Sequence, residues 1–390
     1  MSNINLLVIP SFYPTAEDPL TGNFFHEQII EMSKKVKIGV IYPERRSIKK
    51  INIKGIILNH FQTSFGEEHG IPVYRSHRWN VIPDRFKLGA LLWVRSAIKL
   101  ADQYIKQNGT PDLVHAHCAL WGGYAAKLIA EKYKIPYIIS EHSSSYGLGK
   151  IKSWEEKYIR SAMENASLIT TVSRGFSNTI QEYTNVQNIE VIPNFIDMDF
   201  FTLPPNRIEG EKFIFTSIGW LNKNKGFDLL IRAFHRAFKD QENVYLNIVG
   251  RGSERNNLLK IIKELRLENR VNLLGELNRQ QIRDILWKSH CLVLASYVET
   301  FGIVLIEALA TGIPVIASDT DGPSDIITKE TGLIFRRGDI FSLEKKLQKL
   351  YNDYSFYNSY KIRKYAEDRY SASVVTTKIK ELYEKVIGRN

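Results

Sequence analysis

The chain has 390 residues, of which 44% are hydrophobic and 24% are charged, and its formal net charge is +11. A chain of this length is too long to fold around one hydrophobic core of ordinary size, so we expect two domains. The two cysteines, Cys118 and Cys291, lie far apart, which excludes a disulfide framework and indicates a reducing compartment. No apolar run approaches the roughly 20 residues of a membrane-spanning helix, and the first residues indicate a strand instead of a signal peptide. We therefore expect a cytoplasmic protein.

Positive charge is concentrated between Lys34 and Arg95, where thirteen lysines and arginines accompany four acids. Trp79, Phe86 and Trp93 lie in the same window. Basic residues interleaved with aromatic ones suit an anionic membrane surface, so peripheral binding to the inner face of the cell membrane is expected. A solvated basic face over an ordinary core helix is the alternative. The sequence has no zinc finger, RNA-recognition pattern or basic DNA-reading helix, and nucleic acid is therefore not an expected partner.

The first half of the chain alternates short apolar strands with helical stretches. Strands are predicted at 6–9, 36–41, 113–116, 136–140, 168–172 and 190–192, and helices at 24–32, 88–106, 122–133, 153–166 and 175–183. Such alternation predicts a parallel sheet with helices on both faces.

The pattern pauses near Leu203, Pro204 and Pro205 and then restarts. Strands are predicted at 213–218, 245–249, 271–274, 291–294 and 314–317, separated by helices, and the tail 342–387 is predicted to be helical. We predict an α/β fold of two Rossmann-like, doubly wound domains, 1–203 and 204–370. They are expected to face a central cleft, with ligands at the carboxyl ends of the strands.

The most informative segment is 296–312, SYVETFGIVLIEALATG, in which Glu299 precedes Glu307 by eight residues. It follows a predicted strand and contains a tight turn and then a helix, whose N-terminal amides can hold a diphosphate. At about 1.5 Å per residue, eight positions span roughly 12 Å. That is about the reach from ribose to sugar in a nucleotide diphosphate-sugar. An ordinary amphipathic helix with two exposed acids is the alternative.

This segment resembles the E-x7-E signature of the retaining, GT-B-fold glycosyltransferases of family 4. Four further segments resemble the family in the same order. They are SIGWL with KGFDLL at 217–230, VGRGS at 249–253, LGEL at 274–277, and SD followed by DGP at 318–323. The resemblance implies that residues 371–390 form a helix that crosses back to the first domain. It also implies transfer of a sugar from a nucleotide diphosphate-sugar, expected to be UDP- or GDP-linked, with retention of configuration.

The resemblance assigns roles within the second domain. Glu299 is expected to face the donor sugar, Glu307 to accept hydrogen bonds from the ribose, and Lys225 to stabilise the leaving diphosphate. The other expected donor-binding residues are Gly22, Gly219, Gly250, Arg251, Leu277, Phe301, Gly302 and Ile303. Where the family usually has an arginine this chain has Trp220. One of two usual phosphate cations is therefore missing, and Lys223 or Arg251 could replace it.

The first domain resembles the family more loosely. His142, at the end of a predicted strand, is expected to be catalytic and to meet the sugar or the acceptor, with a satisfied buried histidine as the alternative. Asn23 and His117 are expected to bind the acceptor, and His115 is expected to be structural. Phe25 is expected to be a core residue.

The implied enzyme is a hexosyl- or N-acetylhexosaminyltransferase whose acceptor is a hydroxyl of a saccharide, expected to be lipid-linked, in surface polysaccharide biosynthesis. No metal and no cofactor are expected, and the two D-x-D triplets at 197–199 and 319–321 are interpreted as coincidental. Two alternatives stay open: a non-catalytic GT-B subunit that binds donor, and a nucleotide-sugar epimerase of similar fold.

Overall fold

The computed structural model describes residues 4–16, 18, 21–46, 62–79, 82, 86–205 and 211–388 of the chain. Part of the expected membrane-binding window, including Lys49, Lys50, Lys54 and Arg85, lies outside the described residues. Within the described ranges, no helix combines the length and the apolar character needed to cross a membrane.

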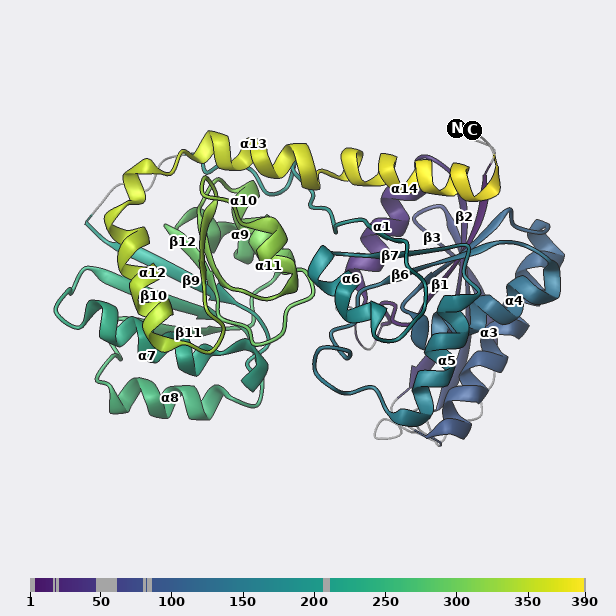
Figure 1. The fold of residues 1–390 in the computed structure, drawn as a ribbon, viewed down its shortest axis with the longest axis horizontal. Coiled ribbons are helices and arrows are strands. Elements are labelled where there is room, and N and C mark those ends of the chain that lie inside the picture. The colour runs from purple at the N-terminus through teal and green to yellow at the C-terminus, as the bar shows by residue number, and fades with distance from the viewer. Residues whose placement is uncertain are drawn as a thin grey trace. The chain divides into compact units, whose positions relative to one another are not determined.

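The chain divides into two compact units (Figure 1): the first is coloured purple to teal and also includes the yellow C-terminal residues, and the second runs from teal to yellow. The first comprises Met1–Val172, Ser177–Ile192 and Thr376–Asn390, and the second comprises Ser173–Phe176 and Pro193–Val375. The division at Pro193 precedes the expected boundary at 204. The physical reason is that Arg363 donates hydrogen bonds to Met198 O (2.8 Å) and Phe201 O (2.6 Å), which fastens this connecting segment to the second unit.

The first unit contains an eight-stranded sheet with the order β3-β4-β2-β1-β5-β6-β7-β8. Its strands are β1 Asn5–Pro10, β2 Lys37–Arg46, β3 Thr63–Glu68, β4 Ile71–Trp79, β5 Leu113–His117, β6 Tyr137–Glu141, β7 Leu168–Thr171 and β8 Ile189–Val191. All pairs are parallel except β3 and β4, which form an antiparallel hairpin at the sheet edge. The sequence reading missed this hairpin, whose turn at His69 and Gly70 has positive φ angles of 52° and 77°.

Helices cover both faces of this sheet (Figure 1). They are α1 Asn23–Ser33, α3 Lys87–Asn108, α4 Tyr124–Tyr133, α5 Ser153–Glu164, α6 Arg174–Gln181 and the C-terminal α14 Ala372–Ile387. The central strands β1, β5 and β6 are almost entirely buried, as expected for parallel strands covered on both faces.

The second unit contains a six-stranded, fully parallel sheet with the order β11-β10-β9-β12-β13-β14. Its strands are β9 Phe213–Ile218, β10 Val244–Val249, β11 Val271–Gly275, β12 Cys291–Leu294, β13 Val315–Ser318 and β14 Gly332–Phe335. Its helices are α7 Phe227–Phe238, α8 Arg255–Glu264, α9 Arg279–Trp287, α10 Ile303–Ala310, α11 Asp321–Ile326, α12 Ile340–Asn352 and α13 Ser359–Tyr370.

The strand order of the second sheet reverses between β9 and β12. A crevice forms at the carboxyl ends of strands where the order reverses, and this is the usual place for a ligand in an open α/β sheet. The core beneath it is aromatic, with Phe215 stacked on Phe238 at a centroid distance of 5.5 Å. The prediction of two doubly wound α/β units is confirmed.

Candidate active site

A lysine and a glutamate meet at the carboxyl edge of the second sheet. Lys225 ends a short 3-10 turn after β9, and its Nζ lies 2.6 Å from Glu299 Oε2 in the loop after β12. The two side chains are 21% and 15% exposed, so the pair is screened from water but reachable. Gly226, at φ 61°, makes this approach possible, because a Cβ there would lie 2.2 Å from Ala295 O.

Asn224 fastens the two loops together. Its Nδ2 donates to Val298 O (3.0 Å), its Oδ1 accepts from Val298 N (3.0 Å), and its carbonyl accepts from Tyr297 N (2.7 Å). On the other side of the loop, Ser318 Oγ donates to Ser296 O (2.6 Å). Asn224 was not predicted as a site residue, since only the folded chain reveals what it contacts.

The backbone after Glu299 is held on both sides. Gly322 N donates to Glu299 O (3.1 Å), and a Cβ on Gly322 would lie 2.2 Å from Phe301 Cα. Ser173 Oγ donates to Thr300 O (2.8 Å). The turn then reverses at Gly302, whose φ of 94° allows α10 to begin at Ile303.

The sequence places Glu299 before the helix and Glu307 inside it, and the separation of roughly 12 Å assumes a helical rise at every residue step. Helix α10 begins at Ile303, so only the last four residue steps rise helically, by about 6 Å. Glu299 is placed instead by the loop contacts described above. Glu307 lies half-buried in the second turn of α10, and the first-turn amides of that helix, from Ile303 onward, are the groups that can meet an anion. Phe301 itself is buried, with 3% exposure.

The loops after β9, β10 and β11 meet beside this pair. A Cβ on Gly250, at φ 146°, would lie 1.9 Å from Gly219 O, so glycine is required for their contact. Arg251 lies over the Trp220 ring, 4.9 Å from its centroid, and its Nη1 is 3.0 Å from Glu276 Oε2. The Arg251 guanidinium therefore stacks on the Trp220 ring. Trp220 occupies the position where an arginine was expected. The phosphate-binding role of Arg251 stays a prediction, as does that of the half-buried Leu277 in the next loop.

In the first unit, a buried carboxylate organises the loop that carries His142. Glu141 Oε1 accepts from the amides of His142 and Ser143 (both 2.9 Å), and Oε2 accepts from Ala119 N (2.8 Å) and Tyr146 Oη (3.0 Å). Burial raises the pKa of Glu141, although these hydrogen bonds favour its ionised form and act in the opposite direction.

His142 packs among aromatic rings. Its ring centroid lies 4.9 Å from that of Phe25 and 5.4 Å from that of Phe24, and its Nε2 is 3.4 Å from His117 Nδ1. His117 is 1% exposed, and burial lowers its pKa well below the ordinary value, so it stays neutral. This position suits a residue that supports His142. The expected acceptor contact of His117 and the expected catalytic role of His142 stay predictions.

Behind them, His115 connects the sheet to the C-terminal helix. Its Nδ1 lies 2.7 Å from Tyr383 Oη on α14, and its Nε2 lies 2.8 Å from Ser140 Oγ on β6. Burial lowers the pKa of His115 to about 3. His115 is therefore neutral at physiological pH and has a structural role, as expected.

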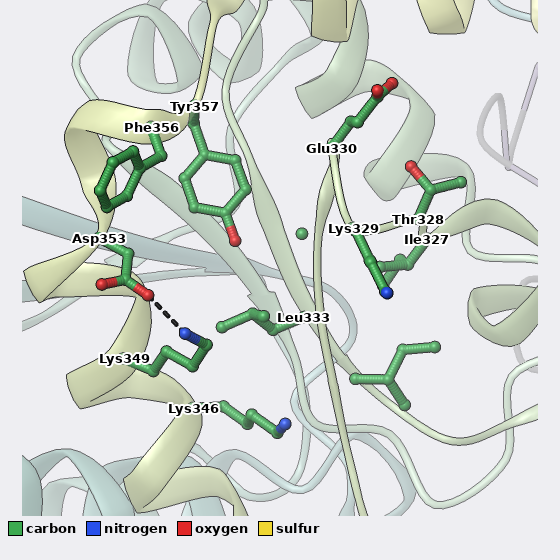
Figure 2. A pocket seen from close by; sticks show the side chains of 12 residues that line it. Ile327, Thr328, Lys329, Glu330, Leu333, Lys346, Lys349, Asp353, Phe356 and Tyr357 are labelled. Carbon is green, nitrogen blue, oxygen red and sulfur yellow. Dashed lines mark hydrogen bonds and ion pairs between the residues drawn. The ribbon is translucent and has the colours of Figure 1, made fainter.

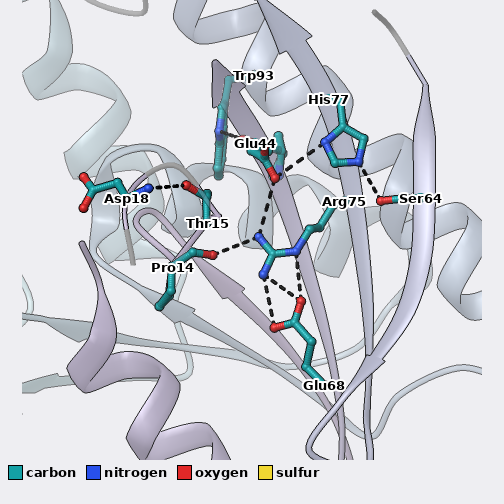
Figure 3. A network of polar contacts seen from close by, with 10 residues as sticks. Pro14, Thr15, Asp18, Glu44, Ser64, Glu68, Arg75, His77 and Trp93 are labelled. Carbon is teal, nitrogen blue, oxygen red and sulfur yellow. Dashed lines mark hydrogen bonds and ion pairs between the residues drawn. The ribbon is translucent and has the colours of Figure 1, made fainter. Parts of the chain in front are cut away.

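An ionic network holds the backbone at Pro14, in the loop that follows β1 (Figure 3). Arg75 on β4 donates to both oxygens of Glu68 (2.8 and 3.1 Å) and to Pro14 O (3.0 Å), and lies 3.7 Å from Glu44. Gly22 itself, at φ 75°, begins α1, and a Cβ there would lie 2.6 Å from Phe12 O. The hairpin that the sequence reading missed thus holds this loop.

Three polar residues that the sequence analysis considered form hydrogen bonds within the fold. Asn23 Nδ2 donates to Glu27 Oε1 (3.0 Å), Asp197 Oδ1 accepts from the amides of Asp199 and Phe200, and Asp319 Oδ1 accepts from Arg337 N (2.7 Å). Asp197 therefore closes a turn, whereas Asp319 joins two segments that lie 18 positions apart in the chain. In the described ranges, no group of three or more His, Cys, Asp or Glu side chains could hold a metal ion.

Comparison with known proteins gives two successive family matches. Glycosyltransferase Family 4 matches residues 55–200, and Glycosyl transferases group 1 matches residues 201–369. TuaC of Bacillus subtilis, assigned to teichuronic acid biosynthesis, is 26% identical over 85% of each protein. The N-acetyl-alpha-D-glucosaminyl L-malate synthase of Bacillus anthracis is 25% identical over 75% of this chain and 78% of that protein. The phosphatidylinositol N-acetylglucosaminyltransferase GPI3 subunit of Saccharomyces cerevisiae is 26% identical over 62% of this chain, which spans 55% of its length.

Solved structures share the architecture. A sucrose-phosphate synthase from Thermosynechococcus elongatus is 17% identical with a TM-score of 0.80 over the whole of both chains. Anabaena HepE, solved in complex with UDP, is 18% identical with a TM-score of 0.75 over 98% of this chain and 100% of that one.

The two doubly wound units, together with the two family matches, define a glycosyltransferase of the GT-B class. The chain belongs to glycosyltransferase family 4, and its second half is a group 1 glycosyl transferase region. This membership supports sugar transfer from a nucleotide sugar as its activity.

Proposed function

We propose that the protein is a retaining hexosyl- or N-acetylhexosaminyltransferase that moves a sugar from a nucleotide diphosphate-sugar to a hydroxyl of a saccharide acceptor. The observation that carries this proposal is the pair of Lys225 and Glu299, 2.6 Å apart at the strand-order reversal and next to the start of α10. An ammonium, a carboxylate and helix amides thus gather where a diphosphate and its sugar can bind.

In the proposed reaction the bond between the anomeric carbon and the diphosphate oxygen breaks, and negative charge grows on the diphosphate. Lys225 and the amides of α10 stabilise that charge. The acceptor oxygen bonds to the anomeric carbon on the same face, and its proton passes to the departing phosphate. Glu299, held by the loop at Asn224, faces the sugar, and Glu307 binds the ribose. No metal and no cofactor take part in the proposed reaction.

The relatives favour particular donors. The Bacillus anthracis and yeast proteins carry N-acetylglucosaminyl in their names, which supports an N-acetylhexosamine or hexose as the transferred sugar. The structure of Anabaena HepE holds UDP, which supports a UDP-sugar, with a GDP-sugar as the second choice.

The proposed acceptor is a lipid-linked saccharide of a surface polymer, such as a capsule, an O-antigen or a wall polymer, met at the inner face of the membrane. Support comes from the role assigned to TuaC and from exposed side chains of the first unit. Phe86 and Leu88 flank the exposed Lys87 and are 53% and 55% exposed, and Phe65 on β3 is 63% exposed. Exposed aromatic and basic side chains suit a headgroup interface. Co-flotation with phosphatidylglycerol vesicles tests the proposed membrane interaction, and a protein that does not co-float would refute it.

Donor turnover tests the central proposal. The full chain is incubated with UDP- and GDP-sugars, saccharide acceptors and a chelator, and nucleotide release and product anomers are measured. Glu299→Gln should abolish transfer while the protein stays folded. Unchanged turnover in that variant, or an inverted product, would overturn the proposal. Conversion of donor without acceptor would identify an epimerase, and absence of turnover with every donor would favour a non-catalytic subunit.

A further inference from the structure

The second unit has an open pocket of about 740 Å³ that the proposed reaction does not use. One wall is the turn 327–330 before β14, and the other is α12 with the segment 353–357 (Figure 2). The turn lies at the amino end of the edge strand β14, whereas Lys225 and Glu299 follow the carboxyl ends of their strands. In a parallel sheet these are opposite edges.

Hydrogen-bond donors line this pocket from both walls. Lys329 lies in the turn and Lys346 lies on α12, and neither forms an ion pair with any residue in the described part of the chain. The Tyr357 hydroxyl points into the pocket (Figure 2). Burial raises the pKa of Tyr357 to about 12, so its hydroxyl stays protonated at neutral pH.

The acids near the pocket do not balance these donors. Asp353 Oδ2 lies 2.5 Å from Lys349 Nζ, so these two charges neutralise each other. The Glu330 carboxylate points away from the pocket (Figure 2). The ammonium groups of Lys329 and Lys346 and the hydroxyl of Tyr357 therefore give the pocket a net positive, hydrogen-bond-donating lining. Such a lining recognises an anion.

The rest of the wall is apolar. Leu333 lies at the base of the pocket (Figure 2), and Phe356 stands at its rim with 83% of its surface exposed. The volume falls within the ~300–1,000 Å³ typical of small-molecule sites. An anion of a few atoms would leave most of it empty, whereas a sugar ring could lie against Leu333 and Phe356.

We propose that this pocket binds a phosphorylated saccharide, with the phosphate held by Lys329, Lys346 and Tyr357 and the sugar ring against Leu333 and Phe356. The site does not depend on the sugar transfer proposed above. The same chemistry fits a free sugar phosphate and a phosphate carried on an oligosaccharide.

Calorimetric titration of the full chain tests this site, with saturating UDP present to occupy the donor edge and low ionic strength to limit screening. The probes are inorganic phosphate, a hexose 6-phosphate and a phosphate-bearing oligosaccharide. We expect saturable binding of the hexose phosphate, and the oligosaccharide arm distinguishes a free ligand from a polymer-borne one. Absence of saturable binding of both saccharide probes would overturn the proposal.

Matched charge variants locate the binding. Lys329→Gln with Lys346→Gln should weaken hexose-phosphate binding about tenfold. Lys345→Gln with Lys361→Gln removes the same charge from two exposed lysines outside the pocket and should leave the affinity unchanged. If both double variants weakened hexose-phosphate binding equally, the ligand would be attracted by the overall positive charge of the protein, and the proposed site would be refuted. Phe356→Ala should weaken hexose phosphate severalfold but not inorganic phosphate, and equal effects on both would refute the sugar contact.

Discussion

Lys225 and Glu299 lie 74 positions apart in the chain, yet their charged atoms are 2.6 Å apart in the fold. Each belongs to a loop at the carboxyl end of a neighbouring strand, and Asn224 joins the two loops. The pair therefore depends on the packing of two strand exits, and the predictions below test that dependence.

Replacing Lys225 by alanine should lower the turnover number by about 10²- to 10³-fold, because one preorganised charge contact to the leaving group is lost. The Michaelis constant for donor should rise less. The exposed Lys263 on α8 offers the matched control, and its alanine variant should lose little. Steady-state kinetics check both. Similar losses in the two variants would argue against a specific role for Lys225.

Asn224→Ala should lower both stability and turnover. Two side-chain hydrogen bonds to Val298 disappear, which costs about 1–3 kcal/mol where the partners are left unsatisfied. The Glu299 loop should then be less ordered, so the turnover number should fall without a large change in donor affinity. Asn222→Ala is the control, since Asn222 is exposed. Urea unfolding and kinetics measure the two effects, and a wild-type turnover number would refute the positioning role.

Gly226→Ala should strongly destabilise the second unit. The φ of 61° disfavours any side chain, and the new Cβ would meet Ala295 O at 2.2 Å, so the strand exits would have to separate. Gly66→Ala serves as the control, because nothing lies within 4 Å of its Cβ position. Thermal unfolding compares them. Equal melting temperatures for the two variants would contradict the close approach.

The stability of the first unit should fall in mild acid. Burial depresses the pKa of His115 to about 3 in the folded protein, against about 6.5 when unfolded. Between these values the unfolded chain binds more protons, so stability falls by about 1.4 kcal/mol for each pH unit below 6.5. Urea unfolding from pH 7 to pH 5 measures the slope.

His115→Gln removes the titrating group and should flatten this dependence, although it also weakens the contact with Tyr383. The variant is therefore judged by its slope and not by its absolute stability. An unchanged slope would mean that other groups, such as the neighbouring His117, cause the acid sensitivity.

Much of the fold was predictable because parallel strands and covering helices leave a strong pattern of apolar runs. The hairpin of β3 and β4 was missed, since β3 is an exposed edge strand, TSFGEE, with little apolar periodicity. The boundary between the units was placed late because prolines at 204 and 205 looked like a linker. Arg363 attaches the preceding segment to the second unit, and such a distant contact leaves no local signal.

By itself, the sequence determined the two doubly wound units and the residues from which the site is built, because buried strands, helix starts and the order of motif blocks are local properties of the chain. Only the tertiary structure decided how those residues meet: the ion pair of Lys225 with Glu299, the clamp at Asn224, and the burial of His117 behind His142. These follow from which strand ends become neighbours and how their loops pack, and contacts between distant segments are settled only when the sheet assembles.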